Sequence, residues 1–310
     1  MGAKETAKRL GRTLSAIHTK IREVGGGREP IGPRVDWTQE ELEYLRQNYQ
    51  LQSIEDLVTH LGKSKSAIRH QAIVLGIKHY IDPYPFFSNW TEESAYTIGF
   101  FAADGNVDKR GPDSFRINFS QKEPDIIYAL RDVVGTGRII TKANGAYEFY
   151  VQSTRTYQLL CKIFGCEVAR KSLTLLWPSV PDTFMRHFIR GAMDGDGSLM
   201  RKKDRTWTIE YTTGSKWFAE GYKETIWRLT GIATHIIVNK LGIPHIRCAG
   251  IKAVCLASWL YKDAKIALER KAWIAREMYE HPGGQAQASS ITPKMREMFP
   301  EIIGAYSIVG

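Results

Sequence analysis

Long hydrophobic runs are missing from this sequence. A membrane-spanning helix needs about 18 or more consecutive apolar residues, and no stretch of the chain approaches that length. The opening residues, MGAKETAKRLGR, lack the apolar core of a signal peptide, and the residues after Gly2 do not make a convincing acylation signal. We therefore expect no spanning helix and a protein of the cytoplasm.

Cysteine is scarce, and its spacing excludes further classes of protein. The four cysteines form no CxxC pair, and no histidine cluster has the spacing of a zinc finger. Because disulfides are rare in reducing compartments, we interpret the cysteines as reduced thiols in the core. They are Cys161, Cys166, Cys248 and Cys255.

Positive charge is what the sequence has in excess. Lysine and arginine number 43 against 33 aspartates and glutamates, which gives a net charge of +10. An excess of this size suits a polyanionic partner, although it would also suit a membrane surface. The 310 residues, 43% of them hydrophobic, are enough for two or three cores of ordinary domain size.

Residues 1–80 contain an internal repeat. LGRTLSAIHTKIREVG starts at Leu10 and LGKSKSAIRHQAIVLG starts at Leu61. Each fits a helix end, a glycine turn, a Ser or Thr cap and a second helix, which is the pattern of a helix-turn-helix. We predict a partial unit at 1–28 and a three-helix unit at 35–80. The polar side of the second helices favours contact with DNA over the alternative, a helical bundle that only packs on the next domain. That side carries His18, Arg22, Lys65, Arg69 and His70.

A larger repeat occupies the centre of the chain, and we place its halves at 90–180 and 181–280, ahead of a C-terminal tail at 281–310. AYTIGFFAADGNV at 95–107 and HFIRGAMDGDGSL at 187–199 each predict an apolar helix that ends in Asp-Gly. After each come a hairpin pattern, a helix, a second hairpin and more helix. FRINFSQ and TIEYTT alternate apolar and polar residues, which indicates strands with one buried and one wet face.

The two Asp-Gly helices carry small residues on one face. Interior glycines such as Gly99 and Gly191 cost a helix about 1 kcal/mol each relative to alanine, and close packing of the two helices would offset that cost. Their C-terminal ends would then lie side by side, each with a partial negative charge and a carboxylate, Asp104 or Asp196. Such a pair of ends predicts a site for a hard divalent cation, Mg²⁺ (or Mn²⁺), which can activate water beside a phosphodiester.

The predicted metal site comprises Ala103, Asp104, Gly195 and Asp196. The next residues, Gly105 and Gly197, can take the left-handed conformation that ends a helix. A lone Asp-Gly would fit a helix stop with a solvated aspartate. Two copies in matching contexts favour a functional site instead.

TIGFFAADG and IRGAMDGDG resemble the two motifs of the LAGLIDADG homing endonuclease family in its single-chain form, and the resemblance covers about 90–280. It implies an α+β fold made of two αββαββα units, which form a pseudo-two-fold, DNA-binding saddle over the major groove, preceded here by the small all-α helix-turn-helix region. It implies cleavage of both strands across the minor groove, with short 3′ overhangs. The second acid of each motif is the metal ligand, which assigns that role to Asp104 and Asp196. The first acid is Asp194 in one copy and is replaced by Ala102 in the other, which does not exclude catalysis.

The resemblance also assigns further catalytic positions. Gln121 matches a polar residue that orders water near the metal, and Thr213 stands at that place in the second copy. Lys171 and Lys271 match basic residues that reach the active site. The alternative for each lysine is a solvated charge at a helix end.

The wet strand faces are predicted to read bases in the major groove, where Arg suits guanine and Asn or Gln suits adenine. An ordinary solvated sheet face would look much the same from sequence. The predicted DNA-binding residues here are Arg116, Asn118, Ser120, Arg138, Lys142, Tyr150, Gln152, Thr208, Glu210 and Thr212.

These features predict a site-specific, divalent-metal-dependent DNA endonuclease that makes a double-strand break at a long site and promotes homing of its own intron or gene. We expect double-stranded DNA as partner, no membrane contact, and a monomer with internal pseudo-two-fold symmetry, of bacterial or phage-encoded type and associated with the nucleoid. Two alternatives stay open. One is a transcription regulator with a degenerate domain of this fold, which the presence of both acids opposes. The other is an RNA-binding intron maturase, which the helix-turn-helix units oppose mildly.

Overall fold

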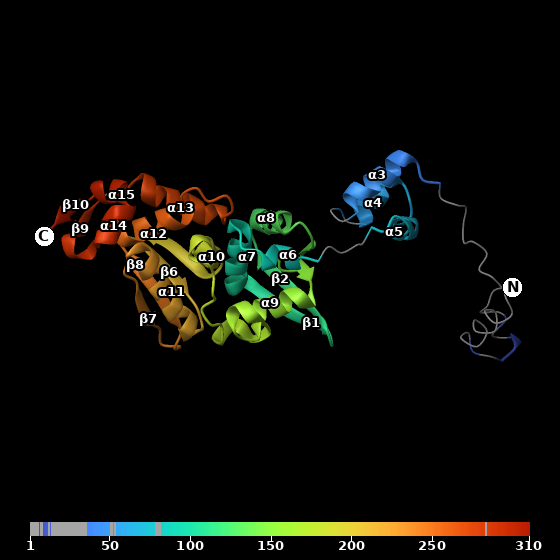
Figure 1. Cartoon of the computed structure of the whole chain (residues 1–310), viewed down its shortest axis with the longest axis horizontal. Coiled ribbons are helices and arrows are strands. Elements are labelled where there is room, and N and C mark those ends of the chain that lie inside the picture. The colour runs from blue at the N-terminus through green and yellow to red at the C-terminus, as the bar shows by residue number, and fades with distance from the viewer. Residues whose placement is uncertain are drawn as a thin grey trace. The chain divides into compact units, whose positions relative to one another are not determined.

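The computed structural model describes residues 6, 9–11, 13, 36–49, 52, 54–77, 82–282 and 284–310. The chain divides into two compact units, Met1–His79 and Tyr80–Gly310, whose elements are labelled in Figure 1. His18, Arg22 and most of the partial unit predicted at 1–28 lie outside the described residues.

The first unit contains the helices α3 (Gln39–Asn48), α4 (Ile54–Leu61) and α5 (Lys65–Val74). Thr38 and Glu41 form a capping box at the start of α3, and the Ser64 side chain caps α5. Gly62 makes the turn between α4 and α5 with a φ of 64°. The helices share one small core of Leu45, Tyr49, Leu57, Leu61, Ile68 and Ala72.

The second unit begins with α6 (Tyr84–Ser88) and then runs twice through one order of elements. In the first half these are α7 (Glu92–Asp104), β1 (Gly105–Gly111), β2 (Ser114–Gln121), α8 (Pro124–Val134), β3 (Arg138–Thr141), β4 (Tyr147–Gln152) and α9 (Thr154–Phe164). The antiparallel sheet has the strand order β1-β2-β4-β3. Thr91 and Ser94 form a capping box at the start of α7, while Gly135 and Gly165 end α8 and α9 in the left-handed conformation.

The second half comes after a 3₁₀ helix, η1 (Val168–Leu173). It consists of α10 (Asp182–Asp196), β5 (Gly197–Arg201), β6 (Trp207–Thr212), α11 (Lys216–Thr230), β7 (His235–Val238), β8 (Pro244–Ala249) and α12 (Ile251–Tyr261). Its sheet has the order β5-β6-β8-β7, which repeats that of the first half. Each half is therefore an αββαββα unit, and the predicted α+β fold with two matching halves is confirmed.

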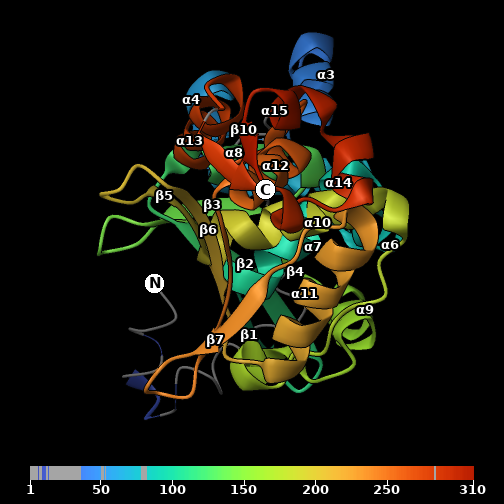
Figure 2. The ribbon, with the colours of Figure 1, turned by 90° about the vertical axis from the view of Figure 1, so that its left-hand side faces the viewer.

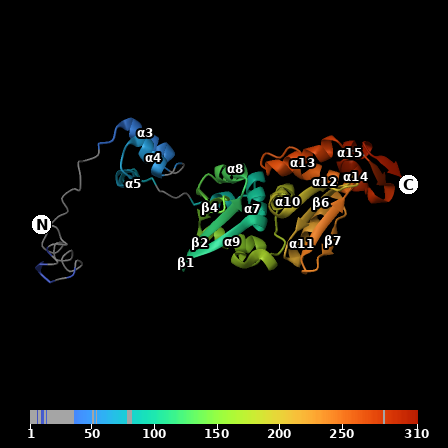
Figure 3. The same ribbon diagram turned by 180° about the vertical axis from the view of Figure 1, so that it is seen from behind.

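Helices α7 and α10 pack against each other along their lengths. They lie side by side in the middle of the second unit, with one sheet on either side (Figures 1 and 3). A Cβ atom on Gly99 would lie 1.9 Å from the Phe188 carbonyl oxygen, and one on Gly191 would lie 2.0 Å from the Tyr96 carbonyl oxygen. Only glycine permits so close an approach. This close helix packing is the contribution predicted to offset the cost of placing glycines inside the two helices.

Each sheet has one face in the hydrophobic core. Ile117 and Phe119 of β2 and Ile209 and Tyr211 of β6 are buried among the helices, and the residues between them in sequence point to the opposite face. Figure 2 shows α9 and α11 on the same side of the two sheets. The two polar faces therefore belong to the other side.

The chain after α12 packs on the second half. Its elements are α13 (Glu269–Glu280), β9 (Gln285–Gln287), η2 (Ala288–Ser290), α14 (Pro293–Met298), α15 (Pro300–Gly304) and β10 (Ser307–Val309). Met295 is fully buried, and the Lys294 Nζ donates to the Arg228 carbonyl oxygen near the end of α11 at 2.7 Å. Among the described residues, no helix is both long and apolar enough to cross a bilayer.

Candidate functional site

Asp104 and Asp196 are the last residues of α7 and α10, and the first strand of each half begins at the next residue. Gly105 (φ −78°, ψ 154°) and Gly197 (φ −91°, ψ 163°) are extended, so the predicted left-handed helix ends are wrong. No loop intervenes that would need such a turn. Glycine is required for space instead, because a Cβ atom on Gly105 would lie 2.5 Å from the Phe101 carbonyl oxygen.

The two helix ends meet. A Cβ atom on Gly195 would lie 2.3 Å from the Ala103 Cβ and 3.4 Å from the Asp104 Cγ. Burial, and after it the negative charge of Asp196, raises the pKa of Asp104 to about 6. Burial also raises the pKa of the more exposed Asp196. Two carboxylates that resist ionisation side by side form a place where a cation would be stabilised.

Gln121 contacts the acid of its own half. Its Nε2 donates to the Asp104 Oδ2 at 3.0 Å, and its Oε1 accepts from the Lys122 backbone N–H at 2.9 Å. Thr213, one residue beyond β6, is buried, and its hydroxyl accepts from the Ser215 backbone N–H at 3.2 Å. The structure therefore places Gln121 at the site and holds Thr213 in the turn before α11.

Lys171 in η1 and Lys271 on α13 are both buried, with exposed fractions of 8% and 2%. Each Nζ donates to carbonyl oxygens in the last turn of one helix. Lys171 contacts Ala102 (2.7 Å) and Ala103 (2.9 Å), and Lys271 contacts Met193 (2.6 Å), Asp194 (2.7 Å) and Gly195 (3.3 Å). Burial lowers the pKa of both lysines to about 8. They cap the two helix ends and place positive charge beside the paired aspartates.

Asp194 has a different environment from Asp104 and Asp196. Its carboxylate is fully buried and accepts from the Tyr96 hydroxyl (2.7 Å), the Tyr261 hydroxyl (2.7 Å) and the Leu268 backbone N–H (2.8 Å). Because this carboxylate is fully buried and accepts three hydrogen bonds, Asp194 is held as part of the interior. Asp194, the first acid of the motif, therefore does not compete with Asp196, the second acid, for the predicted role of metal ligand.

The donors at the helix ends are all oxygens, which suits Mg²⁺ or Mn²⁺. Asp104 and Asp196 supply carboxylates. The carbonyl oxygens of Ala103 and Gly195 already accept from the lysines, which leaves each a second lone pair. No group of three or more His, Cys, Asp or Glu side chains that could hold a metal occurs among the described residues.

The polar face of the first sheet carries a connected cluster of side chains. Glu148 of β4 lies 2.7 Å from the Arg116 Nη2 and 2.6 Å from the Lys142 Nζ, and accepts from the Ser120 hydroxyl at 3.2 Å. The Arg116 guanidinium carbon lies 3.4 Å from the Tyr150 ring centroid. Arg138 of the edge strand β3 and Gln152 at the end of β4 are exposed. Among the predicted residues of this face, only Asn118 is buried, at 2% exposure.

The polar face of the second sheet is organised around Glu210. Its carboxylate lies 2.9 Å from the His245 Nδ1 and 3.9 Å from the Arg247 Nε, and Thr212 is hydrogen-bonded to His245 at 3.2 Å. Thr208 is fully buried. The expected exposure is therefore wrong for Thr208, as it is for Asn118, because both are short side chains on a central strand between two neighbouring strands.

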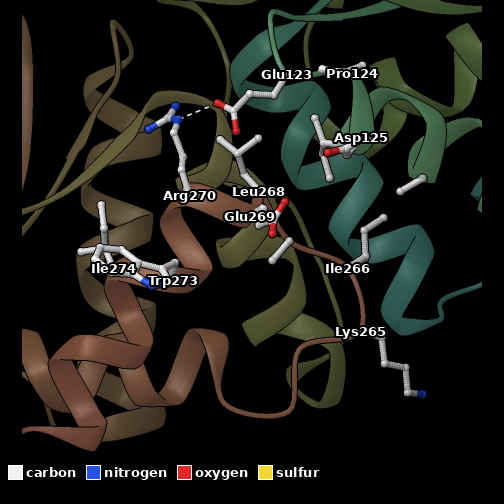
Figure 4. A pocket seen from close by; sticks show the side chains of 13 residues that line it. Glu123, Pro124, Asp125, Lys265, Ile266, Leu268, Glu269, Arg270, Trp273 and Ile274 are labelled. Atoms are coloured by element: carbon white, nitrogen blue, oxygen red, sulfur yellow. Dashed lines mark hydrogen bonds and ion pairs between the residues drawn. The ribbon is translucent and has the colours of Figure 1, made fainter.

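An ion pair joins the halves close to the helix ends. The Arg270 Nε on α13 lies 2.6 Å from the Glu123 Oε1 at the start of α8 (Figure 4), and the positive charge of Arg270 also lowers the pKa of Asp104. The pair stands at the edge of a cavity of about 880 Å³. Residues of both halves line it, among them Ile126, Ala129, Leu268, Trp273 and Ile274.

In the first unit, α5 exposes the three basic side chains that the repeat predicted. Lys65, Arg69 and His70 all lie on its surface, and Lys65 forms an ion pair with Glu55 of α4. The exposed positions agree with a surface available to DNA. They are typical also of an ordinary solvated helix face.

Residues 183–248 match the family model of the LAGLIDADG-like domain. The matched segment runs from α10 to β8 and contains Asp196. The predicted resemblance to LAGLIDADG proteins is thereby confirmed for the second half of the chain. No curated protein matches the sequence.

Several solved structures are similar to the chain. One, of mesophilic variants of the homing endonuclease I-DmoI, shares 16% identity, with 57% of this chain and 93% of that chain covered and a TM-score of 0.42. Another, I-SmaMI bound to an uncleaved DNA target in the presence of calcium ions, shares 13%, with 70% and 98% covered and a TM-score of 0.42. Full-length DUF199/WhiA from Thermatoga maritima shares 15%, with 62% of each chain covered and a TM-score of 0.41.

Three functional candidates were missed from sequence. His245 and Arg247 share the polar face of β8 with Glu210 as their partner, and the alternation in PHIRCA would have found them. Arg270 precedes Lys271 and gives no such signal, because its partner Glu123 lies in the other half.

Proposed function

We propose that this protein is a site-specific, divalent-metal-dependent DNA endonuclease that cuts both strands at a long recognition site and thereby promotes homing of its own intron or gene. The observation that carries the proposal is the meeting of α7 and α10. Two matching halves each bring one carboxylate, Asp104 or Asp196, to adjacent helix ends. One acid per half suits one scissile phosphate per strand.

In this proposal Asp104 and Asp196, with the carbonyl oxygens of Ala103 and Gly195, hold the metal. When bound, a divalent ion supplies activation of water and stabilisation of the leaving oxygen. Gln121 holds the Asp104 carboxylate in place through its Nε2. Lys171 and Lys271 keep the two helix ends neutral enough to lie together, and their charge favours an anionic phosphate nearby.

The polar faces of the two sheets form the DNA interface. The net charge of +10 supports attraction to a polyanion. Arg138, Lys142 and Gln152 from the first sheet, and His245 and Arg247 from the second, are the groups placed to meet base edges and phosphates. The first unit adds Lys65, Arg69 and His70 as further contacts.

The proposal is tested on a plasmid library that carries a randomised insert, because the target is to be discovered. Full-length protein is incubated with the library in MgCl₂, in MnCl₂ or in EDTA, and newly formed ends are sequenced. We expect ends with a common flanking sequence and short 3′ overhangs in either metal, and none in EDTA. Asp104→Asn protein serves as the matched control and should produce no ends.

Two alternatives give different results in the same assay. A transcription regulator of this fold would select a DNA sequence by binding but leave no ends in Mg²⁺ or Mn²⁺. An intron maturase would prefer a structured RNA over duplex DNA when both compete. Either result would overturn the endonuclease.

A further inference from the structure

The first sheet holds a carboxylate at the centre of the face proposed to meet DNA. Glu148 is only 7% exposed, and both of its oxygens are occupied. Its Oε1 accepts from the Arg116 Nη2 at 2.7 Å, while its Oε2 accepts from the Ser120 hydroxyl at 3.2 Å and from the Lys142 Nζ at 2.6 Å. An acid on such a face opposes DNA binding by its charge, so its presence calls for another explanation.

The contacts of Glu148 fix the direction of Lys142. The Lys142 Nζ has three N–H donors. One contacts Glu148 and one donates to the Ser120 hydroxyl at 3.0 Å, which leaves a single donor. The side chain is 39% exposed, so the remaining N–H is available to a ligand in one direction only. A lysine without these partners would turn toward whichever phosphate came near.

Arg116 is fixed by the same acid. Its guanidinium is held at one edge by Glu148 and lies over the Tyr150 ring, with the guanidinium carbon 3.4 Å from the ring centroid. Its Nε is buried without a hydrogen-bond partner among the described residues. The acid and the ring together hold the guanidinium in this position.

We propose that Glu148 is a positioning residue for base recognition: it aims the last N–H of Lys142 at an acceptor on a guanine edge in the major groove and keeps Arg116 and Lys142 from the phosphates. This inference rests on the proposed function as a DNA-binding protein. The negative charge of Glu148 lowers the affinity for DNA, while its positioning of Lys142 increases the discrimination between base pairs. One N–H can be shared between the adjacent O6 and N7 acceptors of guanine, whereas the amino group beside N7 of adenine repels an ammonium.

The second half lacks an equivalent arrangement. At the position that corresponds to Glu148 it has His245, and its acid is Glu210, whose contact with Arg247 is 3.9 Å. No lysine is held there among the described residues of the face. The sharp discrimination should therefore belong to the half-site read by the first sheet.

The experiment selects duplexes by binding from a randomised double-stranded library, with full-length protein in EDTA, and compares the sequences retained by wild type, Glu148→Gln, Lys142→Ala and Asp108→Asn. Asp108 is the matched control. It lies opposite Arg116 on the same face, is 38% exposed, and contacts Asn106 and Arg110 rather than Lys142. Its replacement removes the same charge without releasing the lysine.

Wild type should show a preference for guanine on the order of tenfold at one position of one half-site. Glu148→Gln and Lys142→Ala should reduce that preference to about twofold and leave the other half-site unchanged, while Asp108→Asn keeps it. Both variants that remove an acid should bind unselected duplex several-fold more tightly than wild type. Lys142→Ala retains the Arg116–Glu148 pair, so it tests the reading group even where Glu148→Gln unfolds.

The outcomes separate the two levels of the proposal. A wild-type selection with no consensus at all overturns site-specific DNA recognition itself. A clear wild-type consensus that either Glu148→Gln or Lys142→Ala reproduces overturns the role of Glu148 alone. An equal loss of the guanine preference in Asp108→Asn would assign the effect to the removed charge rather than to the positioning of Lys142. That result would also overturn the role of Glu148.

Discussion

The Tyr96 hydroxyl of the first half donates a 2.7 Å hydrogen bond to the Asp194 carboxylate of the second half. The bond is buried between α7 and α10. Its acceptor, Asp194, precedes the exposed acid Asp196 by two residues. The place of Asp194 in the first motif is taken by Ala102, which is buried without a charge to satisfy. The two motifs therefore match in their second acid. They differ at the first position, where one motif has a buried, hydrogen-bonded aspartate and the other a buried alanine.

Replacing Asp194 should weaken folding and spare catalysis. Asp194→Ala leaves two tyrosine hydroxyls and the Leu268 N–H without their acceptor, so we expect the free energy of unfolding to fall by about 2–4 kcal/mol. Urea denaturation measures this loss. Tyr261→Phe removes one donor and should cost about 1 kcal/mol. Cleavage well below the melting temperature should stay within a few-fold of wild type, and a loss as complete as that of Asp196→Asn would contradict the interior role.

Replacing either acid at the paired helix ends should have the opposite effects. Asp104→Asn and Asp196→Asn should each abolish double-strand cleavage while target binding, measured by gel shift, stays largely intact. Full cutting by either single variant in Mg²⁺ would refute the assignment of that acid.

The same substitution of Asp104 should stabilise the metal-free protein. The pKa of Asp104 is about 6 in the folded chain against 3.8 as its ordinary value, so the folded state binds more protons between these limits and loses stability as the pH rises from about 4 to 6. Asp104→Asn escapes that loss. In EDTA at pH 7.5 the variant should be more stable than wild type by on the order of 2 kcal/mol. This is less than the free energy that corresponds to the whole pKa shift, because the carboxylate is partly solvated. At pH 4 the advantage should vanish, and Mg²⁺ should raise the melting temperature of wild type only.

Loss of a capping lysine should destabilise the helix ends. Lys271→Met removes the donor to three carbonyl oxygens at the end of α10, and we expect about 2–4 kcal/mol lower stability, because unpaired carbonyls cost more than the buried ammonium does. Lys122→Met, an exposed lysine next to Gln121, is the control and should change stability by less than about 0.5 kcal/mol. An unaltered urea midpoint for Lys271→Met would show that the caps are dispensable.

The appended first unit should lengthen the contact with DNA. Removing residues 1–79 should weaken affinity and shorten the footprint, yet leave some cleavage at high protein concentration, because both acids and both sheets lie in Tyr80–Gly310. Lys65→Ala/Arg69→Ala in the full chain tests the same surface without truncation. A footprint of unchanged length would show that this unit does not touch DNA.

Local periodicity was enough to predict the order of elements within each half and the paired helices. The four-residue spacing that includes Gly99 and Gly191 predicted close helix packing, and the strand alternation identified the core residues Ile117 and Ile209. Asp104 could be placed at a helix end because Asp-Gly ends an apolar helical run. These features depend on residues near one another in the chain, where spacing is a direct guide to geometry.

Features that depend on distant residues could not be predicted. Asp194 accepts a hydrogen bond from Tyr261, which is 67 positions away, and Lys271 reaches carbonyl oxygens 76 to 78 positions away. Asn118 looked exposed from alternation, but its neighbours across the sheet bury it. The extended backbone at Gly105 results from a strand that begins with no intervening loop, which sequence spacing does not reveal.

The two catalytic centres should work at unequal rates. Gln121 donates to Asp104 at 3.0 Å, whereas Thr213, its counterpart, is directed at the Ser215 backbone N–H. A long amide can hold an acid or a water across a gap that a threonine hydroxyl cannot span. One strand should therefore be cut first, with a transient nicked intermediate, and Gln121→Ala should slow the strand cut beside Asp104 by about 10-fold or more, the size of effect given by loss of one positioning group. Thr213→Ala, the matched control, should change neither rate by more than about twofold. Strand-specific end labels in a single-turnover reaction measure both rates, and equal rates on the two strands in wild type and in Gln121→Ala would mean that the halves act as equivalent sites.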